Sequence, residues 1–322
     1  MDDESRQNDE SESRRAVDSS DRVGTISPMK VAIIDVGSNS VRLLVASVNA
    51  GNVSQLHRER VYLRLGDDAY RHGRIGTRKL KATRAVAAKY ARFARKAGVE
   101  RLETIVTAPG RQAENHEELV RALVKATRSS VVVLSADEEG RLAWEGAVAR
   151  LDASPDTVGV VDLGGGSCEI AVGARTEGPN WVRSIEAGAL RVTRACLGGN
   201  PPDDERISHA RHEIRELAKN LHPPRPDAAL AVGGTARAVS RIVGRPFGVD
   251  QLEQLASTLS VVPAESVTEP HGITAERAET LLGGTLVLSE IAARLGCDLH
   301  VGRGGLREGA ALALARADAA AA

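Results

Sequence analysis

Two short segments, far apart in the chain, carry the residues whose types and spacing are best suited to chemistry. VAIIDVGSNSVRLLVA (31–46) and VGVVDLGGGSCEIAVG (158–173) both read as apolar strand, D-x-G-x-x-S turn, apolar strand. Glycines permit unusual φ angles and a close backbone approach, and backbone N–H groups with hydroxyls can surround phosphate oxygens. The repeat therefore predicts two phosphate-binding turns, formed by Gly37, Ser38, Asn39 and Ser40 and by Gly164, Gly165, Gly166 and Ser167.

Each turn is preceded by an aspartate, Asp35 or Asp162. A carboxylate repels phosphate, so its natural partner is a hard divalent cation, and Mg²⁺ binds through one or two carboxylates plus substrate phosphates. Either aspartate alone would more simply be a polar strand end that caps a turn. Because both copies carry it, we predict a magnesium site.

A third glycine turn, VGGTARAVSRI (232–242), leads into a predicted helix. Backbone donors and the positive end of the helix dipole favour an anion there. Gly233, Gly234 and Thr235 are therefore candidate phosphate-binding residues. The alternative is that the two glycines only allow tight packing between strand and helix.

Hydrolysis of a phosphoanhydride needs a group that orients water or accepts its proton. Glu138 and Glu139 stand at a strand-to-helix junction, where Ser135 and Glu138 have capping-box spacing. Both glutamates could be first-turn acids, which the helix dipole favours. On the residues alone, capping explains Glu138 well.

IDVGSNSVRLLV, VDLGGGSCEI and VGGT resemble the two phosphate motifs and the adenosine-type motif of the exopolyphosphatase / guanosine pentaphosphate phosphohydrolase (Ppx/GppA) family. That family lies within the actin-like ATPase superfamily, and the similarity runs from about residue 30 to 315, in the short, two-domain form. TAPGRQAEN (107–115), SADEEGRLAWEGA (135–147), IEAGALRVTR (185–194) and GGLREG (304–309) resemble further family segments.

The resemblance implies roles for single residues. It makes Arg111 a phosphate-binding residue and Glu139 the catalytic base, and it makes Glu169 an acid that helps to hold the metal or the water. Asp35, Asp162 and Glu169 are thus the predicted metal residues. Gly140 departs from the alanine usual in the family, and we expect it to loosen the first helical turn. Weaker candidates for additional phosphate contacts are Arg42, Arg141, Arg191 and Arg307.

Composition narrows the class of protein. The chain has 322 residues, with 43 Lys and Arg against 43 Asp and Glu, so anion binding must be local rather than driven by a global field. With only 2% aromatic residues, a stacking platform for nucleic acid is not expected. The three cysteines, Cys168, Cys196 and Cys297, lack metal or disulfide spacing. No apolar run suits a membrane span or a signal peptide, so we predict a cytoplasmic protein without membrane partners.

The order of elements and the internal repeat predict an α/β protein with two similar lobes, and the family resemblance implies that these are ribonuclease-H-like lobes with a cleft between them. Residues 1–28, polar and charged, are expected to be disordered, and Met29 is an alternative start of translation. We place the lobes at 29–150 and 151–322. Strands are predicted at 31–35, 41–48, 101–108, 131–135, 158–173 (as a hairpin) and 228–234, and helices at 77–98, 115–128, 137–151, 204–221, 235–244, 250–260, 275–295 and 306–322.

We therefore predict a magnesium-dependent exopolyphosphatase that releases orthophosphate from the end of inorganic polyphosphate. Guanosine pentaphosphate is the alternative substrate, and the family resemblance leaves a homodimer open. An actin-fold kinase is disfavoured by the DVGSNS turn and by Glu139. A non-catalytic nucleotide or polyphosphate sensor would not need the water-activating acid.

Overall fold

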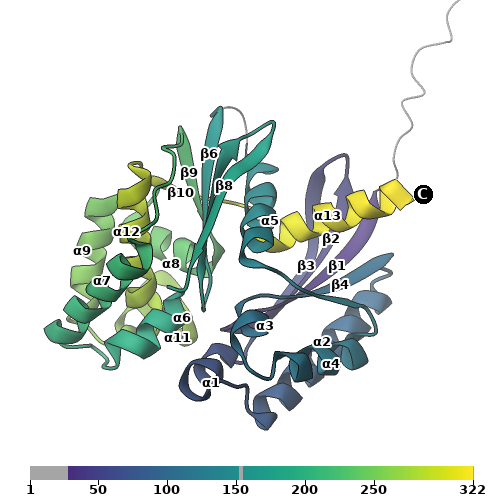
Figure 1. The fold of residues 1–322 in the computed structure, drawn as a ribbon, viewed down its shortest axis with the longest axis horizontal. Coiled ribbons are helices and arrows are strands. Elements are labelled where there is room, and N and C mark those ends of the chain that lie inside the picture. Colours follow the sequence, from purple (N-terminus) through teal and green to yellow (C-terminus); the bar gives the residue numbers. More distant parts are fainter. Residues whose placement is uncertain (1–27, 152–154, 322) are drawn as a thin grey trace, which may run out of the picture.

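The computed structural model describes residues 28–151 and 155–321. Nearly all of the predicted disordered tail, residues 1–28, lies outside these ranges. Within them the chain forms two five-stranded mixed sheets with helices on their faces (Figure 1).

The first sheet has the strand order β3-β2-β1-β4-β5. Its first three strands form an antiparallel meander, and β4 and β5 run parallel to β1. The strands are β1 (Met29–Val36), β2 (Ser40–Asn49), β3 (Asn52–Tyr62), β4 (Arg101–Val106) and β5 (Ser130–Val133).

The second sheet repeats this topology with the order β8-β7-β6-β9-β10. Again three antiparallel strands are extended by two parallel ones. The strands are β6 (Thr157–Leu163), β7 (Cys168–Ala174), β8 (Gly178–Ile185), β9 (Ala228–Val232) and β10 (Leu299–Val301). The prediction of an α/β fold with two related lobes, each opening with the same hairpin, is confirmed.

The helices differ more from prediction. In the first half they are α1 (Leu65–His72), α2 (Thr77–Lys96), α3 (Ala108–Gln112), α4 (His116–Thr127) and α5 (Ala136–Val148). In the second half they are α6 (Ala189–Val192), a π-helix (Thr193–Leu197), α7 (Asp204–Ala218), α8 (Gly233–Val243), α9 (Val249–Leu259), a 3₁₀ turn (Ala264–Val267), α10 (Thr268–His271), α11 (Ala275–Ala278), α12 (Leu281–Leu295) and α13 (Leu306–Ala321). The single helix predicted over 275–295 is wrong, because α11 and α12 are separate.

Three long elements, β3, α1 and β8, were not predicted, and neither were the short α3, α6, α10, β10, the π-helix and the 3₁₀ turn. Residues 52–62 form a strand whose side chains are mostly exposed or half-buried, so they lack the apolar alternation that marks a strand. Pairing with β2 over nearly their full length makes them a strand.

Two helices connect the sheets. The α5 helix packs on the second sheet, and α13 returns across the first sheet and also packs against α5 (Figure 1). A side chain at Gly309 would overlap the carbonyl of Leu142, and one at Gly304 would overlap that of Gly146. These backbone contacts fix α5, and thus its first turn, against both lobes. The α5 helix precedes residue 150 but packs on the second sheet, whereas α13 follows residue 150 but packs on the first sheet. The predicted boundary between the lobes at residue 150 stays a prediction.

No helix in the described part of the chain combines the length and apolar character that crossing a bilayer requires. Cys168, Cys196 and Cys297 are unpaired, as predicted, and the first two are buried.

Candidate active site

The two predicted phosphate turns face each other between the lobes. Each is closed by the same hydrogen bond, from Gly37 N to Ser40 O at 3.1 Å and from Gly164 N to Ser167 O at 3.0 Å. The two copies of the repeated sequence therefore form turns with the same hydrogen bond.

The glycines of the second turn allow this contact. A Cβ atom at Gly165 would lie 3.1 Å from Asn39 Cβ, and one at Gly166 would overlap Ser38 Oγ. None of Gly37, Gly164, Gly165 and Gly166 has a left-handed φ, so the predicted unusual φ is wrong there. The reason for glycine at 165 and 166 is space for the opposite turn.

Two polar atoms in the first turn lack partners. Ser38 Oγ and Asn39 Oδ1 are buried, and neither has a hydrogen-bond partner. Since buried polar groups are normally paired, these atoms mark a place where a polar ligand would be accommodated.

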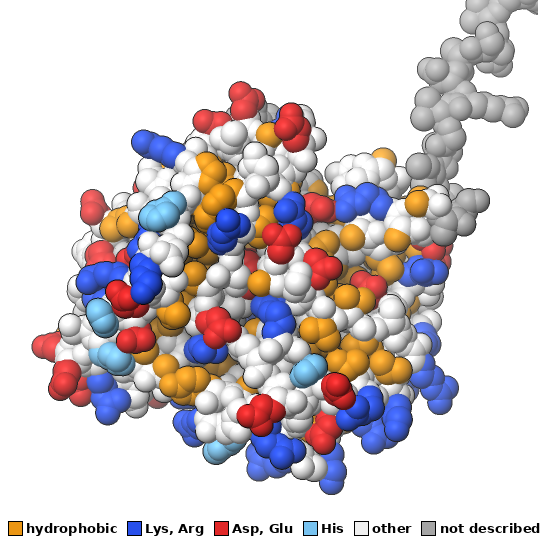
Figure 2. Space-filling model, viewed as in Figure 1, with side chains coloured by type: hydrophobic (Ala, Val, Ile, Leu, Met, Phe, Trp, Pro, Cys, Tyr) orange, Lys and Arg blue, Asp and Glu red, His pale blue; other side chains and the backbone are white. Residues whose placement is uncertain are grey.

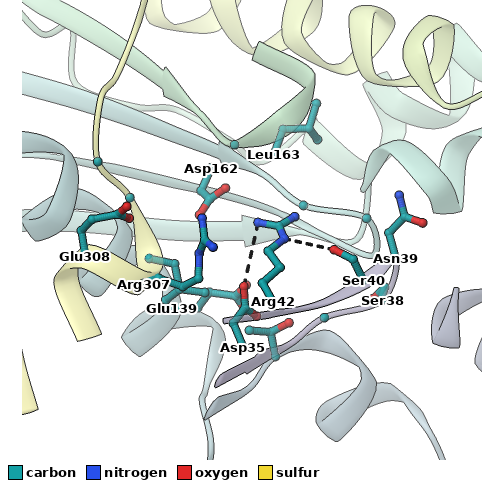
Figure 3. Close-up of a pocket in the computed structure, with 18 of the residues that line it drawn as sticks. Asp35, Ser38, Asn39, Ser40, Arg42, Glu139, Asp162, Leu163, Arg307 and Glu308 are labelled. Atoms are coloured by element: carbon teal, nitrogen blue, oxygen red, sulfur yellow. Dashed lines mark hydrogen bonds and ion pairs between the residues drawn. The ribbon is translucent and has the colours of Figure 1, made fainter. Parts of the chain in front are cut away.

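One pocket opens where the turns meet (Figure 3). The predicted site residues that line it are Asp35, Gly37, Ser38, Asn39, Ser40, Glu139, Asp162, Gly164, Gly165, Gly166, Ser167 and Gly233. Four other predicted residues, Arg111, Glu169, Gly234 and Thr235, do not line it.

Asp35 and Asp162 are the next-to-last residues of β1 and β6, and they point into the same space as Arg42 and Arg307 (Figure 3). Asp35 Oδ2 lies 3.9 Å from Arg42 Nη1, which is too long for a direct hydrogen bond. Burial raises the pKa of Asp162 to about 6, with Arg42 opposing the shift and the Asp35 charge adding to it. The two carboxylates therefore repel each other, and the arginines offset this only in part.

The structure separates the two neighbouring glutamates. Glu138 is exposed and completes the capping box: its Oε2 accepts from Ser135 N at 2.8 Å, and its N–H donates to Ser135 Oγ at 3.2 Å. The predicted capping role is confirmed. Glu139 is buried, lines the pocket and takes no part in the cap.

Arg111, from α3, links two buried glutamates. Its Nη1 donates to Glu139 Oε2 at 2.7 Å and to the carbonyl of Leu134 at 2.8 Å. Its Nη2 lies 3.5 Å from Glu169 Oε1 and 3.4 Å from Ser167 Oγ. Arg111 therefore sits behind the pocket, where it orients Glu139 directly.

The carboxyl groups of Glu139 and Glu169 are weakly acidic in this setting. Burial, and then the Glu169 charge, raises the pKa of Glu139 well above its usual value, although Arg111 opposes the shift. Burial likewise raises the pKa of Glu169 to about 7, despite the hydrogen bond from Ser184 Oγ at 2.9 Å. A carboxylate with a raised pKa is a better proton acceptor at neutral pH.

The three predicted metal residues do not gather into one site. Among the described residues, no group of three His, Cys, Asp or Glu side chains is placed to hold a metal ion. Asp35 and Asp162 share the pocket, whereas Glu169 lies behind it, 1% exposed, beside Arg111. A three-carboxylate site is therefore not formed, and any magnesium site would rest on the two aspartates.

The family model for the Ppx/GppA phosphatase family matches residues 44–317. The chain belongs to the Ppx/GppA phosphatase family. It is 30% identical over 318 residues to exopolyphosphatase 2 of Mycobacterium tuberculosis, covering 89% of this chain and 98% of the relative. It is 29% identical over 276 residues to exopolyphosphatase 1 of Mycobacterium bovis, covering 80% of each chain.

Solved structures agree with the fold. The Aquifex aeolicus PPX-GPPA enzyme matches with a TM-score of 0.74 and 26% identity, covering 89% of this chain and 99% of that one. An exopolyphosphatase from Cytophaga hutchinsonii, at 17% identity and a TM-score of 0.79, covers 90% and 98% and supports the fold alone.

In this Ppx/GppA chain the third glycine turn is only partly in the pocket. Gly233 has φ 93° and lines it. Thr235 is fully buried, and its Oγ1 accepts from Arg277 Nη1 at 2.9 Å. A second pocket adjoins this turn, lined by Arg60, Tyr62, Gly234, Arg237, Ala238, Arg241, Gly272, Ile273, Thr274 and Arg277. Four of these residues are arginines and none is acidic.

The arginines of the main pocket were only partly predicted. Arg42 and Arg307 line it, whereas Arg141 pairs with Asp137 and Arg191 pairs with Glu186 elsewhere. Sequence reasoning missed four others: Arg58, Arg150, Arg237 and Arg303. One of them, Arg58, alternates with Arg60 of the second pocket along residues 52–62, a pattern that can be recognised once that segment is known to be a strand.

Gly140 has a packing role in this Ppx/GppA chain. A Cβ atom there would lie 2.7 Å from Val182 Cγ1 of β8. Although alanine in a helix is about 1 kcal/mol more favourable than glycine, overpacking costs about 1–3 kcal/mol. We therefore expect Gly140→Ala to lower the melting temperature, and Gly140→Ala/Val182→Ala to recover most of the loss in thermal unfolding. A Gly140→Ala protein more stable than the parent would show that the contact is not limiting.

Proposed function

We propose that this protein is an exopolyphosphatase, which hydrolyses the terminal phosphoanhydride bond of inorganic polyphosphate and releases orthophosphate. The observation that carries the proposal is Glu139, a buried carboxylate held by Arg111 in a pocket built from two phosphate-type turns. The relatives named exopolyphosphatase support the choice of substrate.

The proposed reaction uses the two turns to hold the terminal phosphate. Backbone N–H groups and the hydroxyls of Ser38 and Ser167 would donate to its oxygens, which would give Ser38 Oγ the partner it lacks. Glu139 would orient a water molecule in line with the scissile P–O bond and accept its proton. Arg111 would keep the Glu139 carboxylate in place and is a positioning residue.

The residues at the pocket floor fit a magnesium ion. Asp35 and Asp162 offer hard oxygen ligands, and a divalent cation would relieve their mutual repulsion. When bound, the ion would neutralise charge that develops on the phosphate oxygens.

The test is release of orthophosphate from long polyphosphate, guanosine pentaphosphate and ATP in parallel. We expect release from polyphosphate to exceed release from ATP, to fall at least about 10²-fold on chelation with EDTA, and to return with added Mg²⁺. Undiminished release in EDTA would remove the metal from the proposal, and no release from any substrate would favour the sensor.

Guanosine pentaphosphate is the second candidate substrate. The arginine-lined pocket beside Gly234 favours it, because the ring of Tyr62 stands there among four cations. Faster hydrolysis of guanosine pentaphosphate than of polyphosphate would establish this alternative.

A further inference from the structure

The rim of the main pocket carries three arginines that the proposed chemistry does not use. Arg58, Arg150 and Arg303 line this pocket, and all three are exposed. They come from β3, from the turn that follows α5 and from the loop before α13. None belongs to the turns or to the Glu139 cluster, so the reacting phosphate does not account for them.

The position of Arg58 follows from strand register. It lies opposite Leu44 in the β2–β3 pair, and directly opposed residues share a sheet face. Leu44 packs in the cluster that contains Leu306 of α13. Arg58 thus projects from the face of the first sheet that is turned toward α13 and the pocket.

Arg150 and Arg303 are brought to the pocket by the glycine contact between α5 and the loop before α13. A side chain at Gly304 would overlap the carbonyl of Gly146. Arg303 adjoins Gly304, and Arg150 follows Gly146 by about one helical turn. The same backbone contact that joins the lobes therefore places two arginines on one pocket.

Arginines outnumber acids in the lining of the main pocket: Arg42, Arg58, Arg150, Arg237, Arg303 and Arg307 line it, against Asp35, Glu139, Asp162 and Glu308. Within residues 28–151 and 155–321, no ion pair or side-chain hydrogen bond joins Arg58 or Arg150 to another residue. Among the acids of the pocket, Glu139 is bound to Arg111 and Asp35 lies 3.9 Å from Arg42. The chain is neutral overall, and basic and acidic side chains are interspersed on the face in Figure 2. The lining of the main pocket therefore carries a local excess of positive charge.

We propose that Arg58, Arg150 and Arg303 form a subsite for the phosphates that follow the reacting one in a linear chain. The subsite deepens the proposed function and rests on it: a long polyphosphate reaches the rim and gains contacts that a very short chain lacks. Each phosphate neutralised releases counterions, so the contribution depends on ionic strength.

The test is the variant Arg58→Ser/Arg150→Ser/Arg303→Ser. For long polyphosphate we expect kcat/KM to fall by about 10- to 100-fold through KM, while kcat/KM for tripolyphosphate stays within about two-fold. The slope of log Kd against log salt for long polyphosphate should decrease by about one for each lost contact. A matched control is Arg84→Ser/Arg92→Ser/Arg175→Ser, three exposed arginines outside the pocket, which should change neither quantity.

Three outcomes would overturn the subsite: unchanged kinetics and salt slope, equal losses on both substrates, or a selective loss for long chains in Arg60→Ser/Arg241→Ser but not in the rim variant. The last result would indicate that long polyphosphate binds in the second pocket instead. If the parent protein hydrolyses no phosphoanhydride, the proposed function fails, but the salt slope of binding still decides whether the rim holds polyphosphate.

Discussion

Replacing Glu139 with glutamine should lower orthophosphate release by about 10²–10⁴-fold, because the amide keeps the shape of the side chain but cannot accept the proton from water. Binding of polyphosphate should persist or tighten, since a buried negative charge near the phosphates is removed. Steady-state release and equilibrium binding of long polyphosphate, measured on the same preparation, separate the two effects.

The neighbouring acid provides the matched control. Glu138→Gln removes a carboxylate of the same helix turn that is exposed and caps the helix. It should cost about 1 kcal/mol or less of stability and leave release within about two-fold. Near-normal release by Glu139→Gln, or a comparable loss in Glu138→Gln, would rule out Glu139 as the base.

Arg111→Met should produce the second large effect, on activity and stability together. It leaves Glu139 and Glu169 buried without their shared cation, and breaking such a cluster from one side costs about 3–5 kcal/mol. The pKa of Glu139 should rise further, so less of the deprotonated base is present at pH 7. We expect release at pH 7 to fall by about 10²-fold and the acidic limb of the pH–rate profile to move to higher pH.

The sign of the stability change with pH is also defined. A carboxyl group whose folded pKa lies above its unfolded value costs stability as pH rises through the folded pKa. The loss in Arg111→Met should therefore be greater at pH 8 than at pH 5 in chemical denaturation. The control is Arg121→Met, which removes an ion pair with Glu117 on the surface of α4 and should cost under about 1 kcal/mol. A pH-independent loss in Arg111→Met would contradict the role assigned to its charge.

Much of the fold was predictable because its signals are local. The hairpins at Asp35 and Asp162 are short apolar strands joined by glycine turns, and their repetition indicates two similar lobes. The capping box of Ser135 and Glu138 depends only on spacing along one helix turn. The strand Asn52–Tyr62 was not predicted because most of its residues are polar. It is a strand because it pairs with β2.

For the candidate site, too, the parts that depend on consecutive residues were predicted and the parts that depend on distant residues were not. Its turns and Glu139 were found from motifs, because the residues of each motif are consecutive in the chain. Residue types alone did not show that Glu169 lies behind the pocket, or that Arg277 donates a hydrogen bond to the hydroxyl of Thr235. Whether two carboxylates share a ligand depends on distances between strands that are far apart in sequence.

The sequence by itself determined the two glycine hairpins, the capped glutamate helix and, through its resemblance to the Ppx/GppA family, the class of chemistry. Only the tertiary structure decided which arginines face the pocket and why Gly165 and Gly166 must be glycines. The physical reason is that a motif is defined along one short stretch of backbone. A pocket wall is instead defined by the packing of α5, α13 and the two sheets, which brings Arg58, Arg150 and Arg303 together from three distant parts of the chain.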